Sequence, residues 1–272
     1  MTVIFLRDEL ARAWEGKDSF DCVRSLKGEV FRAREGRRTL RFFMDGRSYF
    51  LKHHRGVGWG EVLKNLSQLR LPIVSALSEV RAIEAVAAAG VHTMTIAGYG
   101  EQGLNPARVE SFLITDDLAE TLSLEDVGLL WLLHPPCPAF KRALIANVAG
   151  VARVMHAAGI NHRDFYLCHF LIGRSGFHAG DGQAPLFLID LHRAQVRRRV
   201  PWRWQVKDMS GLFYSAMDIG LTRRDLLRAM AAYTGKNWRE ALQEERPFWL
   251  AVRKRAESLY LKDKGKEAPR WI

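Results

Sequence analysis

Hydrophobic and polar residues alternate along the early part of the chain in a pattern typical of short antiparallel strands. Three such runs, Val30–Arg34, Thr39–Phe43 and Ser48–His53, are separated by the turn signals Glu35-Gly36 and Asp45-Gly46. Asp-Gly is a strong hairpin signal because both residue types tolerate positive φ. The pattern therefore predicts a three-stranded antiparallel sheet.

After this sheet the periodicity changes to that of a helix, and two further strands follow. Apolar positions predict a helix from about Ser75 to Ala89, which ends where Gly90 can adopt a left-handed conformation. Strand-like runs come next at Thr93–Tyr99 and Ser111–Thr115. We thus expect the first part of the chain to be rich in β structure.

Helical periodicity takes over after Leu118. Apolar positions with a 3.6-residue period predict a long helix over 138–158, and a polar loop, Asn161–His169, follows it. A strand pair is expected around Phe170–Gly173 and Leu186–Leu191. The remaining helices are expected at about 208–218, 222–233 and 238–262.

These patterns predict an α+β fold with a small β-rich N-lobe over residues 1–117 and a larger helical C-lobe over residues 118–272. The longest apolar run, Leu129–Leu133, is far too short to span a bilayer, and the N-terminus does not resemble a secretory signal. The three cysteines lie far apart, which fits a reducing environment. The sequence therefore predicts a cytoplasmic protein.

The formal net charge of +11 narrows the choice of partners. Such an excess attracts nucleic acid, acidic lipid head groups, phosphorylated substrates or acidic carrier proteins. Nucleic acid is disfavoured because no aromatic RNA-binding motif or helix-turn-helix pattern accompanies the charge. An acidic partner such as acyl carrier protein would suit the basic surface, on charge alone.

Four features occur in the order and structural context of the protein-kinase signature set. Lys52 lies in the third predicted strand, and Glu79 lies early in the helix that follows. His162-Arg163-Asp164 lies in the polar loop, and Asp190 ends an apolar strand. Lys52, Glu79, Asp164 and Asp190 are separated by 27, 85 and 26 positions. Each feature alone is common, but the four in this order predict a kinase.

The chemistry of phosphoryl transfer explains these residue types, because it requires mainly positioning and charge neutralisation. Lys52 can reach the phosphates of ATP while Glu79 holds it in place. Asp164 can orient the attacking hydroxyl and accept its proton. Asp190 can bind Mg²⁺, which prefers hard oxygen ligands and bridges the phosphates.

A longer sequence motif around His162-Arg163-Asp164 indicates which kind of kinase this is. Residues 161–171, Asn-His-Arg-Asp-Phe-Tyr-Leu-Cys-His-Phe-Leu, resemble the catalytic loop of the lipopolysaccharide core heptose(I) kinase family (WaaP/RfaP). The similarity continues through residues 60–66, 69–72, 189–193 and 206–215, and it covers roughly residues 28–235. It implies a bilobal protein-kinase-like fold and transfer of the ATP γ-phosphate, with Mg²⁺, to a hydroxyl of the first inner-core heptose.

The same resemblance implies where the enzyme works and what its residues do. The acceptor would be the lipopolysaccharide inner core or its lipid A precursor, met at the cytoplasmic face of the inner membrane. Asp164 would be the base, Lys52 with Glu79 the phosphate-binding pair, and Asp190 the metal ligand. The segment 112–118 would be the hinge, where backbone groups near Asp116 and Leu118 meet the adenine.

Two positions depart from general protein kinases. His169 stands where those enzymes carry a metal-binding Asn, so it is either a second metal ligand or a structural hydrogen-bonding residue. The turn between the first two strands has one glycine, Gly36, in place of a glycine-rich loop. The nearby arginines are candidates to compensate for this. The neighbouring His53 and His54 point to opposite faces of a strand, so they are not expected to share a metal ion.

A basic segment with tryptophans follows Asp190, where an acceptor would bind. Arginines bind phosphate and carboxylate groups, and tryptophans stack on sugar rings. A solvated basic loop is the alternative explanation. The candidate acceptor-binding residues are Arg163, Arg193, Arg197, Arg199, Trp202, Arg203 and Trp204.

The C-terminal stretch 248–266 carries an apolar stripe beside many lysines and arginines. It can lie on the anionic inner leaflet of a membrane, or it can pack on its own domain, which is the commoner use of such a stripe.

Two other functions stay open at this stage. A kinase for aminoglycosides or choline would share the loop motif, but it would need an acidic acceptor pocket, which the arginine-rich segment contradicts. A catalytically idle kinase fold used as a binding module is disfavoured by the intact set of Lys52, Glu79, Asp164 and Asp190.

Overall fold

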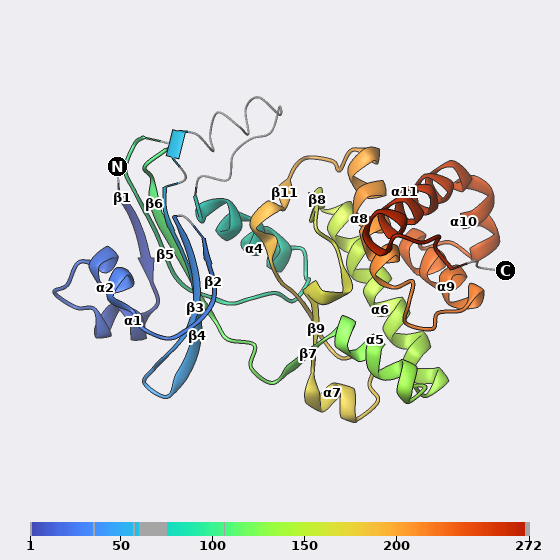
Figure 1. Ribbon diagram of the computed structural model, residues 1–272, viewed down its shortest axis with the longest axis horizontal. Helices are drawn as coiled ribbons and strands as arrows, with labels where there is room; N and C mark the ends of the chain where they lie inside the picture. The colour runs from blue at the N-terminus through green and yellow to red at the C-terminus, as the bar shows by residue number, and fades with distance from the viewer. Residues whose placement is uncertain (1, 35, 57, 60–74, 106, 270–272) are drawn as a thin grey trace. The chain divides into compact units, whose positions relative to one another are not determined.

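The computed structural model (Figure 1) describes residues 2–34, 36–56, 58–59, 75–105 and 107–269. The chain divides into two compact units. Unit 1 comprises residues 1–84 and 94–119, and unit 2 comprises residues 85–93 and 120–272. The lobe boundary after residue 117 stays a prediction. The segment 60–72, which contributed to the family resemblance, lies outside the described residues.

Among its described residues, unit 1 is built on a six-stranded sheet with the order β1-β5-β6-β4-β3-β2. All neighbouring strands pair antiparallel. The strands are β1 Thr2–Leu6, β2 Glu29–Arg34, β3 Arg37–Met44, β4 Arg47–Arg55, β5 Ile96–Gln102 and β6 Glu110–Asp116. The helices are α1 Asp8–Ala13, α2 Ser19–Ser25 and α4 Leu77–Ala88, the last of which runs on into unit 2.

The two faces of the sheet have different roles. Alternate residues of β4, including Leu51, are buried in a core to which α1 and α2 contribute Leu10 and Phe20. Since side chains alternate along a strand, Lys52 points to the opposite face. The sequence predicted β2 to β6 approximately, but it missed β1, α1 and α2. The residues of β1 are mostly exposed, so they lack the alternating pattern that reveals a half-buried strand.

His53 belongs to the buried face and has a carboxylate partner. Its Nε2 lies 2.9 Å from Oε1 of Glu110. Burial alone would raise the pKa of Glu110, but hydrogen bonds from Arg24, Gln102 and His53 outweigh it and lower this pKa to about 2. Burial lowers the pKa of His53, so its contact with Glu110 is a hydrogen bond of the neutral imidazole. No cluster of three or more metal-ligating side chains occurs in the described ranges.

Unit 2 is mainly helical, as Figure 1 shows, and α6 packs against α9 while α8 packs against α11. Its helices are α5 Leu124–Leu133, α6 Pro138–Ala157, α7 Arg174–His178, α8 Trp202–Ser215, α9 Arg223–Thr234, α10 Trp238–Glu244 and α11 Arg246–Lys264. Its strands and short 3₁₀ helices are β7 Thr121–Ser123, β8 Ile160–Asn161, η1 Leu167–His169, β9 Phe170–Gly173, β10 Leu186–Leu188, η2 Leu191–Arg193 and β11 Gln195–Val196.

Three sequence-based expectations in this unit are wrong in detail. The strand expected over 186–191 ends at Leu188, because Asp190 adopts a left-handed conformation with φ of 60°. The single helix expected over 238–262 is two helices, interrupted at Glu245 before Pro247 at the start of α11. α8 begins at Trp202 and not near residue 208, so part of the presumed acceptor loop is helical.

The apolar stripe near the C-terminus packs within unit 2. Phe248, Trp249, Val252, Ala256 and Tyr260 are all buried on one face of α11. This settles the two explanations of the stripe in favour of core packing. Among the described residues, no helix combines the length and apolar character needed to cross a bilayer.

Candidate active site

Unit 1 contributes the pair Lys52 and Glu79. Lys52 lies in β4, a central strand flanked by β3 and β6, and Glu79 lies in the first turn of α4. The Lys52 Nζ donates to Glu79 Oε1 over 2.7 Å, and only 2% of Glu79 is exposed. A buried carboxylate of this kind fixes the position of the ammonium group. The structure therefore brings together the two residues that the sequence predicted as a pair.

A carboxylate of α8 anchors the loop that carries Asp164. The Asp208 carboxylate, which is fully buried, accepts hydrogen bonds from the amides of His162 at 2.6 Å and Arg163 at 2.8 Å. Arg163 is left-handed, with φ of 76°, which is uncommon for a residue other than glycine. Asp208 thus holds the backbone in a turn that presents Asp164.

Gly211, one turn further along α8, allows the same loop to approach the helix closely. A Cβ at this position would lie 2.9 Å from the carbonyl oxygen of Phe165. A larger residue would therefore push the loop away from α8.

Asp164 is engaged by an arginine from η2. The Arg193 Nη1 donates to both carboxylate oxygens of Asp164, at 2.8 and 2.9 Å. The left-handed Asp190 turns the chain after β10, and Arg193 follows three residues later. A hydroxyl that uses Asp164 as its base must share or replace this contact.

The geometry of His169 and Asp190 suits a Mg²⁺ site of the kinase type. His169 Nδ1 donates to the Asp164 carbonyl oxygen at 2.7 Å, which fixes the tautomer and leaves the lone pair of Nε2 for a ligand. That Nε2 lies 3.6 Å from Asp190 Oδ2. Mg²⁺ needs only one or two protein ligands when phosphates and waters complete its shell. These two donors, at one spot, fit that requirement.

His162 supports this arrangement from the core. It is fully buried and donates through Nε2 to the Ile189 carbonyl, and its ring stacks on that of His169 with centroids 5.6 Å apart. Burial lowers the pKa of His162, so it acts as a neutral hydrogen-bond donor. It ties the loop of Asp164 to the segment of Asp190.

Trp204, in the basic segment that follows Asp190, lies next to the loop that carries Asp164. Three guanidinium groups and one ammonium lie over its ring: Arg163 at 5.0 Å, Arg203 at 5.4 Å, Lys207 at 5.5 Å and Arg197 at 5.9 Å. We call these four cations with Arg193 the basic cluster. Cations over an indole face are attracted by its quadrupole. The cluster leaves a surplus of positive charge beside Asp164.

Other predicted residues lie outside this cluster. Arg199 is exposed, and the ring of Trp202 packs edge-on against Phe248 of α11. In unit 1, the amide of Asp116 donates to the Thr95 carbonyl, and its carboxylate forms an ion pair with Arg7. The roles of Asp116 and Leu118 toward adenine stay predictions.

No role for Asp208 was predicted from the sequence, and Lys207 was only one member of the basic segment that follows Asp190. A signal for Asp208 was present, since it falls on the buried face of α8 among Val206, Met209 and Leu212. A carboxylate at such a position requires a hydrogen-bonding partner. Without the fold, that partner could not be named.

The fold and this arrangement of side chains define a protein-kinase-like phosphotransferase. Residues 21–233 match the lipopolysaccharide kinase (Kdo/WaaP) family. The chain is 47% identical to the lipopolysaccharide core heptose(I) kinase WaaP of Pseudomonas aeruginosa, over 94% of this chain and 96% of the relative. It is 49% identical to the Escherichia coli K12 enzyme of that name, over 89% and 91%.

A solved structure, WaaP in complex with acyl carrier protein, superposes with a TM-score of 0.82 at 43% identity, covering 95% of this chain and 99% of that one. The chain therefore belongs to the lipopolysaccharide kinase (Kdo/WaaP) family. These matches confirm the family resemblance and the kinase-like α+β fold that were inferred from the sequence.

Proposed function

We propose that this protein transfers the γ-phosphate of ATP to a heptose hydroxyl in the inner core of lipopolysaccharide. The observation that carries the proposal is the Asp164 loop, held by Asp208 and bordered by the basic cluster, in a chain of this family. Such a loop places a general base where an acceptor hydroxyl can reach it.

The contacts of Lys52, Asp190 and His169 support the roles proposed for them, and the roles of the other residues come from the family resemblance. Lys52, held by Glu79, binds the ATP phosphates. Asp190, with His169, holds Mg²⁺, which would neutralise charge on the phosphates when bound. Asp164 orients the heptose hydroxyl and accepts its proton. Backbone groups of the 112–118 segment, near Asp116 and Leu118, meet the adenine.

The acceptor is polyanionic, and the basic cluster fits it. The inner core with its lipid A carries carboxylates and phosphates, which arginine recognises through paired hydrogen bonds. Arg163, Arg197 and Arg203 stack on Trp204, so their guanidinium groups are held in place before the acceptor arrives. A cationic acceptor such as an aminoglycoside or choline would be repelled by the same charges.

The test is transfer of radiolabelled γ-phosphate from ATP with Mg²⁺ to purified, unphosphorylated core lipopolysaccharide, with kanamycin and choline as rival acceptors. We expect label on lipopolysaccharide alone, and none with the Asp190→Ala variant. Label on kanamycin or choline would support a kinase activity but contradict lipopolysaccharide as the acceptor. ATP binding without transfer to any acceptor would favour a binding module.

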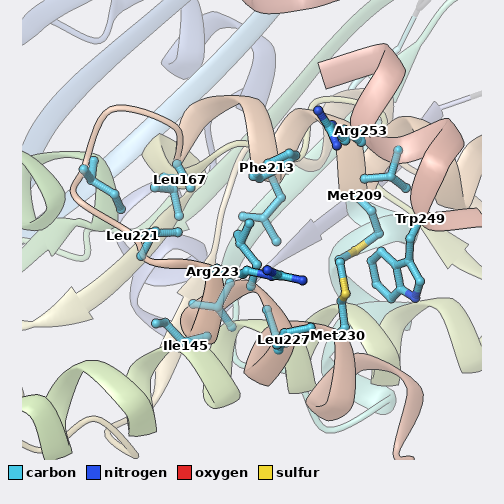
Figure 2. A pocket seen from close by; sticks show the side chains of 18 of the residues that line it. Ile145, Leu167, Met209, Phe213, Leu221, Arg223, Leu227, Met230, Trp249 and Arg253 are labelled. Atoms are coloured by element: carbon cyan, nitrogen blue, oxygen red, sulfur yellow. The ribbon is translucent and has the colours of Figure 1, made fainter. Parts of the chain in front are cut away.

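We also propose acyl carrier protein as a partner. A cavity of about 490 Å³ lies within unit 2, between α5, α6, α8, α9 and α11. Figure 2 shows that its walls are mostly apolar side chains, among them Ile145, Met209, Met230 and Trp249. Its volume is typical of ligand sites. Acyl carrier protein carries a fatty acyl chain, and an apolar cavity of this size suits such a chain.

The charges around the cavity fit an acidic carrier. Three of the lining residues, Arg223, Arg246 and Arg253, are arginines, and all three are exposed. Complementary charge steers a partner and fixes its orientation. Two independent observations thus support this proposal: the similarity to a solved structure of WaaP in complex with acyl carrier protein, and the apolar cavity of this chain.

This partnership can be tested by titrating purified protein with acylated and unacylated carrier. We expect the acylated form to bind more tightly and to raise the melting temperature, because a ligand of the native state stabilises it. Arg223→Glu should weaken binding, whereas the neighbouring Arg224→Glu, outside the cavity lining, should not. Equal affinity for both forms of the carrier would exclude a role for the cavity.

Finally, we propose that the enzyme works at the cytoplasmic face of the inner membrane, where a lipid-linked acceptor would be met. The exposed basic residues of α11, among them Lys254 and Lys262, can face anionic lipid. Vesicle sedimentation with and without anionic lipid, at two salt concentrations, tests this. Absence of binding to anionic vesicles would contradict it.

A further inference from the structure

Lys207 is a half-buried lysine whose charge no carboxylate of the described chain neutralises by direct contact. It lies on α8, one residue before Asp208 and one turn after Trp204. Its ammonium lies 5.5 Å from the centre of the Trp204 ring. Within the described residues, no ion pair or hydrogen bond engages it. Its one partner there is the face of the Trp204 ring, so no anion in direct contact compensates the charge of Lys207.

The charges around Lys207 come from the catalytic loop, from η2 and from its own helix. Burial is the main influence on Lys207 and lowers its pKa to about 8, the nearby Asp164 and Asp208 raise it, and Arg193 and Arg163 lower it. Lys207 is thus close enough to Asp164 to feel its charge. Both oxygens of Asp164 are nevertheless bonded to Arg193.

The backbone at Lys207 is tied to the loop that carries the base. The carboxylate of Asp208, the next residue of the helix, accepts the amides of His162 and Arg163. The same segment of α8 therefore sets both the turn that presents Asp164 and the start of the Lys207 side chain. A preorganised cation next to the base stabilises charge that develops during a reaction.

We propose that Lys207 is a catalytic residue that binds the phosphoryl group under transfer. This inference rests on the proposed function. In the reaction the bond between the γ-phosphorus and the bridging oxygen of ATP breaks, and ADP leaves with that electron pair. A bond forms between the phosphorus and the heptose oxygen, whose proton passes to Asp164. Lys207 keeps its protons throughout and donates hydrogen bonds to the phosphoryl oxygens.

A surface lysine that merely adds to the basic cluster is the competing explanation. It would help the acceptor to bind, so its loss would raise the KM for lipopolysaccharide and leave kcat nearly unchanged. A cation that contacts the moving phosphoryl group acts on the transition state, so its loss lowers kcat. The two explanations differ in which kinetic constant changes.

The experiment compares wild type, Lys207→Met, Lys207→Arg and the control Lys236→Met in labelled-phosphate transfer to core lipopolysaccharide. For Lys207→Met we expect kcat to fall about 10²–10³-fold, the range seen when one transition-state donor is removed. The KM for ATP should change little. Lys207→Arg, which keeps a charge, should retain much more activity. Lys236, which follows the end of α9, pairs with Glu244 and Glu245 outside the basic cluster, and its loss should leave kcat unchanged.

The dependence of kcat/KM for ATP on pH gives a second readout. In wild type this constant should fall as the pH rises past about 8, because Lys207 loses its charge there. In Lys207→Arg this loss should disappear, since a guanidinium remains charged. Folding of each variant is checked by thermal unfolding and by ATP binding.

The outcomes separate the inference from the function on which it rests. If the wild-type protein transfers no label to lipopolysaccharide, the proposed function is wrong. Active wild type with a folded Lys207→Met variant of near-normal kcat overturns the role of Lys207. The role of Lys207 is also overturned if kcat/KM of Lys207→Arg falls at high pH as it does in the wild type.

Discussion

Asp208 is the residue whose removal we expect to cost both stability and catalysis, although it is fully buried. Its buried carboxylate accepts two backbone amides, from His162 and Arg163, and lies 3.4 Å from His156 Nε2. The substitution Asp208→Ala leaves both amides without a partner in the protein interior. Hydrogen bonds to a charged group contribute about 1.5–3 kcal/mol each.

The expected loss of folding free energy follows from these two bonds. We expect Asp208→Ala to lower the free energy of unfolding by about 3–5 kcal/mol. Each kcal/mol shifts the melting temperature of a chain of this size by roughly 2–4 °C. The variant should therefore melt on the order of 10 °C below wild type. Thermal unfolding followed by circular dichroism measures this shift.

The catalytic loss should persist where the variant is still folded. The loop that presents Asp164 is no longer tied to α8, and a misplacement of about 1 Å costs roughly 10²-fold in rate. We expect kcat to fall by about that factor. The assay is phosphate transfer to core lipopolysaccharide at a temperature at which circular dichroism shows native structure.

A second buried carboxylate provides the matched control. Asp225 caps α9 through Thr222 and forms an ion pair with Lys141 at 2.9 Å, but it makes no contact with the Asp164 loop. Asp225→Ala should lower stability by about 1–3 kcal/mol and leave kcat within about twofold of wild type. Equal losses of kcat in the two variants, or a normal kcat for Asp208→Ala, would refute the anchoring role.

Three further predictions concern other parts of the molecule. Lys52→Met should lower kcat/KM for ATP by about 10²-fold or more, and Glu79→Gln by less, because the amide still accepts a hydrogen bond; initial rates at varied ATP measure both. The pKa of Glu110 is lowered in the folded protein, so at pH values above its unfolded-state pKa of about 4.5 the ionised carboxylate should stabilise the fold by roughly 3 kcal/mol. This stabilisation is lost as the pH falls toward 2, and Glu110→Gln should flatten the pH dependence of acid unfolding. Gly211→Val should displace the loop at Phe165 and lower kcat more than the KM for ATP, whereas unchanged kinetics would show that the loop tolerates the added atoms.

The candidate site residues that the sequence predicts lie in local motifs, and their roles in catalysis stay predictions. Lys52 and Glu79 were found because a strand and a helix follow each other in a fixed order, and the structure pairs them at 2.7 Å. Asp164 and Asp190 were found from short strings next to predicted elements. Each of these signals depends on nearby positions alone.

The features that were missed depend on tertiary contacts. Asp208 anchors a loop more than 40 positions earlier in the chain, and no local pattern reveals that contact. The left-handed backbone of Asp190 ended a strand that its apolar residues would have continued. The exposed strand β1 takes its conformation from pairing with β5, which lies over 90 residues away in sequence.

The measurement that tests the central claim most directly is mass-spectrometric identification of the product formed from ATP and unphosphorylated core lipopolysaccharide. It compares wild type with Asp164→Asn, a variant of nearly the same size that cannot accept the hydroxyl proton. We predict one added phosphate on an inner-core heptose with wild type, and none with Asp164→Asn although ATP still binds. Phosphate on another sugar, or a heptose phosphate formed equally well by Asp164→Asn, would contradict the account.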